Sequence, residues 1–154
     1  MQLDNIPIYK IEEFKKMREA GSLAAHVLDQ LYKLIKPGMS TLEINDFCHE
    51  LIIKNNAIPA PLNYKGFPKS VCTSVNHVVC HGIPNQNKIL NAGDIINVDV
   101  TVILDGWYGD SSRMFVAGQA NKKNLELLKI TYECLQLGIK EAQPGKTFGD
   151  IGYK

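Results

Sequence analysis

The sequence predicts an α+β fold in which amphipathic helices cover an antiparallel β-sheet, and in which one structural unit begins twice. Three observations lead to this prediction. The stretch from Gly93 to Gly118 reads as a β-hairpin, long segments on both sides of it have helical periodicity, and the same short pattern follows each long helix. The 154 residues are enough for one ordinary domain with a buried core.

Two helices are expected before the hairpin. Apolar residues recur at steps of three and four from about residue 11 to residue 35, which gives one apolar stripe along a helix. Pro37-Gly38 ends that helix. Ser40, followed three positions later by Glu43, is a capping box, so a second helix is expected over residues 41–55.

The segment between the second helix and the hairpin contains two candidate strands. Ser70–Val75 and Val78–Cys80 read as short strands, and Gly82 begins a turn that leaves His81 at a strand end. An imidazole in that position can reach into a cleft. On spacing alone, His81 is equally consistent with a structural hydrogen bond and with catalysis. Cys80 is expected to be buried, as free cysteines commonly are.

The hairpin places acidic side chains on a strand face. Asp105-Gly106 is a strong two-residue turn signal, and with that turn Asp110 lies opposite Thr101, with Asp99 as its diagonal neighbour. Side chains alternate between the two faces of a strand. One face then carries Asn97, Asp99, Thr101, Tyr108, Asp110 and Ser112, and the other carries Ile96, Val98, Val100 and Val102.

Two carboxylates on one strand face need an explanation. Asp is depleted in strands, and carboxylates only about 7 Å apart repel each other unless a cation lies between them. A divalent metal ion, or a pair of them, would remove the repulsion. A solvated polar face of an antiparallel sheet is an equally weighted alternative. A one-residue slip of the turn would send Asp99 and Asp110 to opposite faces.

The third helix, over Asn121–Ala142, introduces the repeat. It is followed by residues 144–151, PGKTFGDI, which match residues 37–44, PGMSTLEI. Both read P-G-x-[S/T]-x-x-[E/D]-I and both follow a long amphipathic helix. A first repeat is therefore expected over about residues 11–118, and a second one begins at about residue 121. We expect the 154 residues to be the first half, or somewhat more, of a two-fold repeated domain.

Composition narrows the functional classes. The formal net charge is +1 and no basic run is present, so neither nucleic acid nor an anionic membrane is favoured as a partner. Apolar runs are too short to span a bilayer and the N-terminus lacks a signal-peptide profile, which favours the cytoplasm. The four cysteines are scattered without a C-x-x-C motif, so neither a zinc ribbon nor a disulfide framework is indicated.

Four motifs resemble one known family. They are KMREAGSLAAHVL at residues 16–28, KPGMSTLEI at 36–44, KSVCTSVNHVVCHGIP at 69–84 and GDIINVDVTVILDGWYGD at 93–110. Together they resemble the type I methionine aminopeptidases of bacterial or organellar character, over the whole chain. The resemblance implies the pita-bread fold, two α/β halves related by pseudo-two-fold symmetry. It also implies a peptidase M24-type domain, incomplete here, that removes the initiator methionine from nascent proteins.

The resemblance also implies roles for individual residues. Asp99 corresponds to a bidentate ligand of one metal ion and Asp110 to the carboxylate that bridges two. His81 corresponds to a catalytic, substrate-contacting histidine. The remaining matches are the methionine-pocket residues Tyr64, Phe67 and Cys72, and the monovalent-cation residues Asn76 and Val78. Two positions depart from common relatives, because Lys65 stands where histidine is frequent and Pro61 where cysteine is frequent.

Cofactors and partners follow from the same resemblance. It implies two divalent metal ions, drawn from Co, Mn, Fe, Zn or Ni, that activate a water while an apolar pocket accepts methionine. The implied partner is an N-terminal Met peptide or a nascent protein at the ribosome, and the intact protein is expected to be a monomer. In the family, a histidine and two glutamate ligands come from the second half. We therefore expect the 154-residue chain alone to be inactive.

Two alternatives remain open. Aminopeptidase P, prolidase and creatinase-like enzymes share the pita-bread architecture, and the first two place paired aspartates on such a hairpin. Some other pita-bread proteins have lost their metals and act as binding modules. Those proteins typically lose the metal ligands first, whereas Asp99, Asp110 and His81 are all present here.

Overall fold

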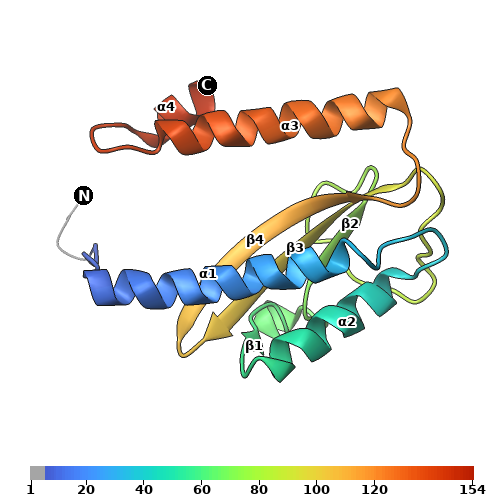
Figure 1. Cartoon of the computed structure of the whole chain (residues 1–154), viewed down its shortest axis with the longest axis horizontal. Helices are drawn as coiled ribbons and strands as arrows, with labels where there is room; N and C mark the ends of the chain where they lie inside the picture. The colour runs from blue at the N-terminus through green and yellow to red at the C-terminus, as the bar shows by residue number, and fades with distance from the viewer. Residues whose placement is uncertain (1–5) are drawn as a thin grey trace. The chain divides into compact units, whose positions relative to one another are not determined.

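The computed structural model describes residues 6–154 and divides the chain into two compact units, one that ends at Gly118 and one from Gln119 to Lys154. The first unit contains two helices and a four-stranded antiparallel sheet (Figure 1). Its elements are α1 (Ile11–Leu31), α2 (Thr41–Lys54), β1 (Ile58–Pro59), a 3₁₀ turn (Tyr64–Gly66), β2 (Cys72–Val75), β3 (Ile95–Leu104) and β4 (Trp107–Val116). None of the described helices is both long and apolar enough to cross a membrane.

β3 and β4 form the predicted hairpin. Asp105 and Gly106 have φ angles of 49° and 82°. Left-handed backbone at both turn positions matches the twist of the two strands and closes the hairpin without an extra residue. Leu104 then pairs with Trp107, and Thr101 pairs with Asp110. The predicted register is confirmed, so Asp99 and Asp110 lie on the same face.

The other face of the hairpin forms the core. Val98, Val100 and Val102 are fully buried there, in one cluster with side chains from α1 and α2. Both helices therefore cover the same side of the sheet, which Figure 1 shows. Burial of such side chains contributes about 1.5 to 3 kcal/mol each. The polar face of the hairpin is left for the site.

Helix α1 and strand β4 approach each other closely at Gly109. A Cβ atom added to Gly109 of β4 would overlap the backbone carbonyl of Ala20 in α1. Only glycine fits this crossing. Arg113 of β4 also makes an ion pair with Asp29 of α1, at 2.6 Å.

β3 is the central strand of the sheet. β4 pairs along its whole length, from Ile95 to Leu104. The other edge of β3 is shared, because β2 pairs with its first half and β1 with Val102 and Ile103. The chain between β1 and β2 leaves this edge and returns to it.

The first helix is shorter than expected. It ends at Leu31, where the backbone N–H of Leu34 donates to the Leu31 carbonyl in a tighter turn. Tyr32 is 76% exposed. The apolar periodicity continues to Ile35, but the turn that leads into Pro37 takes the backbone out of the α-helix.

The predicted strand Val78–Cys80 is wrong. Asn76 and His81 both have left-handed backbone, with φ angles of 52° and 54°, and the segment between them forms a loop. One backbone hydrogen bond, from Thr73 N to Gly82 O at 2.8 Å, ties the returning chain to β2. Cys80 is consequently exposed, which corrects the expectation that it is buried.

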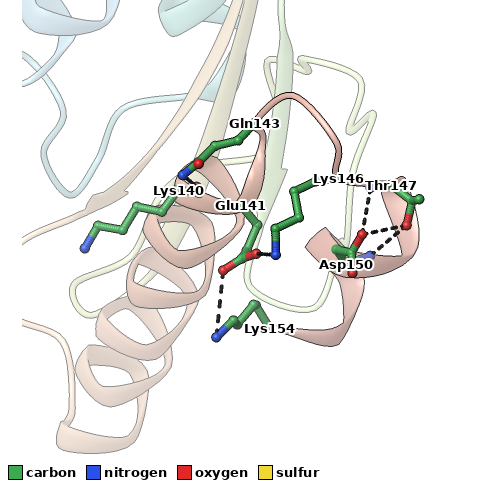
Figure 2. A network of polar contacts seen from close by, with 7 residues as sticks. All are labelled: Lys140, Glu141, Gln143, Lys146, Thr147, Asp150 and Lys154. Atoms are coloured by element: carbon green, nitrogen blue, oxygen red, sulfur yellow. Dashed lines mark hydrogen bonds and ion pairs between the residues drawn. The ribbon is translucent and has the colours of Figure 1, made fainter.

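The second unit contains α3 (Lys122–Glu141) and α4 (Phe148–Tyr153). The third helix is confirmed within one residue of each predicted end, with Asn121 as its N-cap. None of its residues is buried in the part of the chain that the structure describes. Glu141, near its C-terminus, makes ion pairs with Lys146 at 2.9 Å and Lys154 at 3.7 Å (Figure 2).

The repeated pattern produces the same local structure twice. At α2, Ser40 N donates to the Glu43 carboxylate at 2.7 Å, and Glu43 N donates to Ser40 Oγ. At α4, Thr147 N donates to the Asp150 carboxylate at 2.7 Å, and Asp150 N donates to Thr147 Oγ1 (Figure 2). Each is a reciprocal capping box that satisfies the first backbone donors of its helix.

Candidate metal centre and substrate pocket

Two aspartates project from the polar face of the hairpin. Asp99 of β3 pairs with Ser112, and Asp110 of β4 pairs with Thr101, so the two carboxylates are diagonal neighbours. Thr101 Oγ1 donates a 2.8 Å hydrogen bond to Asp110 Oδ1. This bond restricts the orientation of the Asp110 carboxylate and leaves its second oxygen for another ligand.

The two carboxylates lie in a pocket of about 880 Å³. Most of the other side chains around it are apolar or aromatic, with one imidazole and one lysine. The lining residues are Ala60, Pro61, Tyr64, Lys65, Gly66, Phe67, Pro68, Cys72, His81, Ile83, Asp99, Thr101, Tyr108 and Asp110. A largely apolar cleft with a few converging polar groups is the usual form of a small-ligand site.

One wall of the pocket is the segment 60–72, here called the pocket loop. At its start, Ala60 N donates to Thr101 O at 2.9 Å, and at its end Cys72 pairs with Asp99 in the sheet. Both ends are therefore held by β3 beside the two aspartates. Tyr64, Phe67 and Cys72, which the family resemblance assigns to the methionine pocket, line the cavity from this loop.

His81 enters the pocket from the loop that follows β2. Its backbone is in the left-handed region, which non-glycine residues adopt infrequently and mostly in turns or at functional sites. The hydrogen bond between Thr73 and Gly82 holds the next residue against β2. His81 thus lies in the same pocket as Asp99 and Asp110.

Burial raises the pKa of two side chains that line the pocket from the sheet. Desolvation, reinforced by the charge of Asp110, raises the pKa of the Asp99 carboxyl above its ordinary value. Desolvation, and secondarily the charge of Asp99, raises the pKa of the Cys72 thiol to about 11. Cys72 is therefore a neutral, weakly polar wall, and Asp99 carries a charge that is poorly compensated by the surrounding protein.

The two carboxylates provide part of a binding site for a divalent cation. Paired carboxylates are the ligands that hard and borderline divalent metals prefer, and a cation would relieve the repulsion that raises the pKa of Asp99. Within residues 6–154, no group of three or more histidine, cysteine, aspartate or glutamate side chains gathers as a metal would require. Two carboxylates are fewer than the about three protein ligands of typical catalytic zinc centres.

Asn76 and Val78 lie elsewhere. Neither residue lines the pocket. The Asn76 side chain donates to Asp94 at 2.8 Å and accepts from Ile95 N at 3.1 Å, so it links the turn after β2 to the start of β3. These bonds give Asn76 a structural role.

Sequence reasoning placed Thr101 on the aspartate face but gave it no function. Its hydrogen bond to Asp110 makes it a positioning residue for that carboxylate. The sequence could have predicted this hydrogen bond, because the register that places Asp110 opposite Thr101 brings a hydroxyl and a carboxylate together. Ala60, Ile83 and Tyr108 also line the pocket without having been assigned to it.

Comparison with known proteins yields one family. The model of metallopeptidase family M24 matches residues 15–154. The chain is 56% identical over 148 residues to a methionine aminopeptidase of Rickettsia prowazekii, covering 96% of this chain and 57% of that protein. It is 47% identical over 148 residues to the methionine aminopeptidase of Escherichia coli K12, covering 96% of this chain and 56% of that protein. The chain thus spans less than three-fifths of the length of these relatives.

Solved structures support the same relationship. The crystal structure of methionine aminopeptidase from R. prowazekii matches with a TM-score of 0.94 and 57% identity, over 96% of this chain and 59% of that one. Prolidase from Pyrococcus furiosus matches with a TM-score of 0.78 at 21% identity, over 94% of this chain and 41% of that one, which shows a shared fold alone. These matches confirm the predicted pita-bread fold, an antiparallel sheet with helices of which this chain covers only part.

Proposed function

Because the chain belongs to metallopeptidase family M24, we propose that the protein containing it is a methionine aminopeptidase that hydrolyses the first peptide bond of polypeptides beginning with methionine. The observation that carries the proposal is the meeting of Asp99, Asp110 and His81 in one largely apolar pocket. A paired-carboxylate centre beside an apolar cavity suits the removal of an apolar N-terminal residue.

Each part of the pocket has a chemical role in this proposal. Asp99 and Asp110 would hold two divalent metal ions, which supply Lewis-acid activation of a water and of the scissile carbonyl. Thr101 fixes the Asp110 carboxylate through its hydrogen bond. His81 donates a hydrogen bond to the substrate at the scissile bond, where negative charge develops. The metals are among Co, Mn, Fe, Zn and Ni, all of which accept such ligands.

The apolar wall selects the first residue. Tyr64, Phe67 and Cys72 face the cavity from the pocket loop, and the Cys72 thiol is neutral because burial raises its pKa to about 11. A neutral apolar pocket favours the unbranched, polarizable side chain of methionine.

The 154-residue chain alone is proposed to be inactive. It offers two carboxylates where a catalytic metal centre takes about three protein ligands. The twin capping boxes support a repeated domain, with a first repeat over about residues 11–118 and a second from about residue 121. Further ligands from that second repeat would complete the centre, and its side chains would cover the exposed apolar stripe of α3.

The setting of the reaction follows from the substrate. The proposed substrates are nascent proteins as they leave the ribosome, in the cytoplasm, and short Met peptides. The enzyme is proposed to act as a monomer. The near-neutral charge of the chain gives no reason to add a nucleic-acid partner.

The test is hydrolysis of Met-Gly-Met-Met with added Mn²⁺ or Co²⁺, by the full-length protein and by residues 1–154. Methionine release is expected from the full-length protein and not from the shorter chain. Asp110→Asn should abolish release, whereas Asp105→Asn, an exposed turn carboxylate outside the pocket, should not. A parallel panel of Met-Ala and Ala-Pro peptides separates this activity from Xaa-Pro hydrolysis. Cleavage of Ala-Pro peptides alone would contradict the proposal.

A further inference from the structure

Lys65 occupies the tip of the pocket loop. The loop leaves β3 beside Thr101 and returns beside Asp99, and Lys65 lies near the middle of the segment between these two anchors. It also lines the pocket, although its side chain is exposed. Lys65 therefore lies on the loop side of the cavity, here called its rim, whereas Asp99 and Asp110 lie on the sheet strands, here called its floor.

The backbone holds Lys65 in a defined position. Asn63 and Lys65 have φ angles of 67° and 48°, both in the left-handed region. Backbone hydrogen bonds close the turn on both sides, from Asn63 N to Phe67 O at 2.8 Å and from Phe67 N to Tyr64 O at 2.9 Å. The Lys65 ammonium lies 5.5 Å from the centroid of the Tyr64 ring. A cation over an aromatic face is attracted to it but keeps its charge.

The charge of Lys65 is not neutralised by the described part of the chain. Within residues 6–154, no carboxylate forms an ion pair with Lys65. Lys65 is also the one lysine or arginine among the residues that line the pocket. The paired carboxylates would be neutralised by the metal ions they are proposed to hold, whereas the positive charge of Lys65 has no partner within residues 6–154.

The unpaired charge of Lys65 suits one kind of peptide. The proposed function places the substrate amine and the scissile bond at the carboxylate floor, so the chain beyond the first residue must leave the pocket past the rim. An extended peptide advances about 3.3 Å per residue, so the residues just after the cleaved bond reach the rim. We infer that Lys65 makes this enzyme favour peptides that carry a carboxylate within one to three residues after the cleaved bond.

The inference rests on the proposed function and adds a substrate class to it. The carboxylate has two sources, an Asp or Glu side chain in a protein or the C-terminus of a short peptide. An exposed ion pair contributes little, and the expected gain in kcat/KM is about two- to fivefold. The gain should reside in KM, because a contact remote from the reacting atoms stabilises the bound substrate and the transition state equally. Added salt should reduce it.

The experiment uses the full-length protein with Mn²⁺ and measures released methionine. Met-Ala-Xaa-Ala-amide peptides with Xaa as Glu, Gln or Lys report the side-chain source. Met-Ala-Ala with a free or an amidated C-terminus reports the terminal source. Each series is run on wild type, Lys65→Met, Lys65→Glu and Lys65→Arg, at low salt and at 0.5 M salt. Lys69→Met is the matched control, because Lys69 lies on the same loop but does not line the pocket.

Wild type, Lys65→Arg and Lys69→Met are expected to favour the Glu peptide or the free C-terminus by about two- to fivefold, mainly in KM. Lys65→Met should remove this preference and Lys65→Glu should reverse it. Equal rates for the Glu, Gln and Lys peptides and for both C-termini in wild type would overturn the inference and leave the proposed function intact. So would a preference that survives in Lys65→Met. Failure to release methionine from any peptide would overturn the proposed function itself.

Discussion

Thr101 Oγ1 and Asp110 Oδ1 are 2.8 Å apart across the hairpin, in a hydrogen bond between directly paired residues of β3 and β4. The bond uses one oxygen of a carboxylate that the proposed mechanism needs as a metal ligand. Outer partners of this kind orient metal ligands and are nearly as important as the ligands. Two predictions concern this centre directly.

Thr101→Val keeps the shape of the side chain and removes the donor. We expect the affinity of the full-length protein for Mn²⁺ to fall by about 10-fold or more, because Asp110 loses its fixed orientation. The melting temperature of the metal-free protein should change little, since the bond is exposed. Isothermal titration calorimetry with Mn²⁺ measures the first quantity. Ser111→Ala, which removes a hydroxyl from the opposite face of β4, should leave affinity unchanged.

Asp99→Asn should stabilise the metal-free protein and abolish its stabilisation by metal. In the unfolded chain, Asp99 loses its proton near its ordinary pKa of 3.8. Burial raises the pKa of Asp99 in the folded state, so the folded protein keeps this proton to a higher pH. Stability is therefore lost as pH rises from 3.8 through the folded pKa, and it stays lower at pH 7. The neutral amide removes this loss.

The measurement is the melting temperature at pH 7 with chelator and with Mn²⁺. Wild type should gain stability with Mn²⁺, since a ligand that binds the folded state stabilises it. Asp99→Asn should melt above wild type in chelator and should not respond to Mn²⁺. The exposed Asp105→Asn variant should respond to Mn²⁺ as wild type does. A lower melting temperature for Asp99→Asn in chelator would show that the carboxylate is not destabilising.

Gly109→Ala should destabilise the first unit by about 2 to 3 kcal/mol. The added methyl group overlaps the Ala20 carbonyl, so α1 must move away from β4. Gly21→Ala is the matched control on the same helix, because a Cβ there has no atom within 4 Å. That change should stabilise the protein by about 0.5 to 1 kcal/mol, through helix propensity. Urea denaturation followed by circular dichroism gives both values.

The four thiols should differ in reactivity at pH 7. Burial raises the pKa of Cys48 to about 12 and that of Cys72 to about 11, whereas Cys80 and Cys134 are exposed. Only the thiolate reacts, and a pKa of about 11 in place of 9.0 leaves about one-hundredth of the thiolate. Brief treatment of the native protein with iodoacetamide should label Cys80 and Cys134, as read by peptide mass spectrometry. Rapid labelling of Cys72 would mean that the pocket floor is open to solvent.

The parts of the fold that local chemistry determines were predictable from the sequence. Asp105-Gly106 closes a two-residue turn, and that turn fixes which residues pair in the hairpin. Ser40 and Glu43 likewise identify the start of α2 to the residue. The alternation of valines in β3 gave the buried face for the same reason.

Outside the hairpin turn, features that depend on left-handed backbone at residues other than glycine were not predictable. Val78–Cys80 has strand-forming residues, but left-handed backbone at Asn76 and His81 takes it out of the sheet. The turn of the pocket loop depends on left-handed backbone at Asn63 and Lys65. Neither residue is a glycine, so the sequence did not indicate this conformation.

The candidate site divides in the same way. The Asp105-Gly106 turn and the strand periodicity together predicted that Asp99 and Asp110 share a face, and the structure shows that they line one pocket. Tyr64 and Phe67 were assigned to the site only through the family resemblance. Nothing in their local sequence indicates that this loop lines a pocket.

Both ends of the pocket loop are held by the strand that carries Asp99. Under the proposed function, a substitution between those anchors would change which peptide is accepted while the paired carboxylates keep their positions. Substrate preference could then be redesigned on this loop without altering the strands that carry the proposed metal ligands.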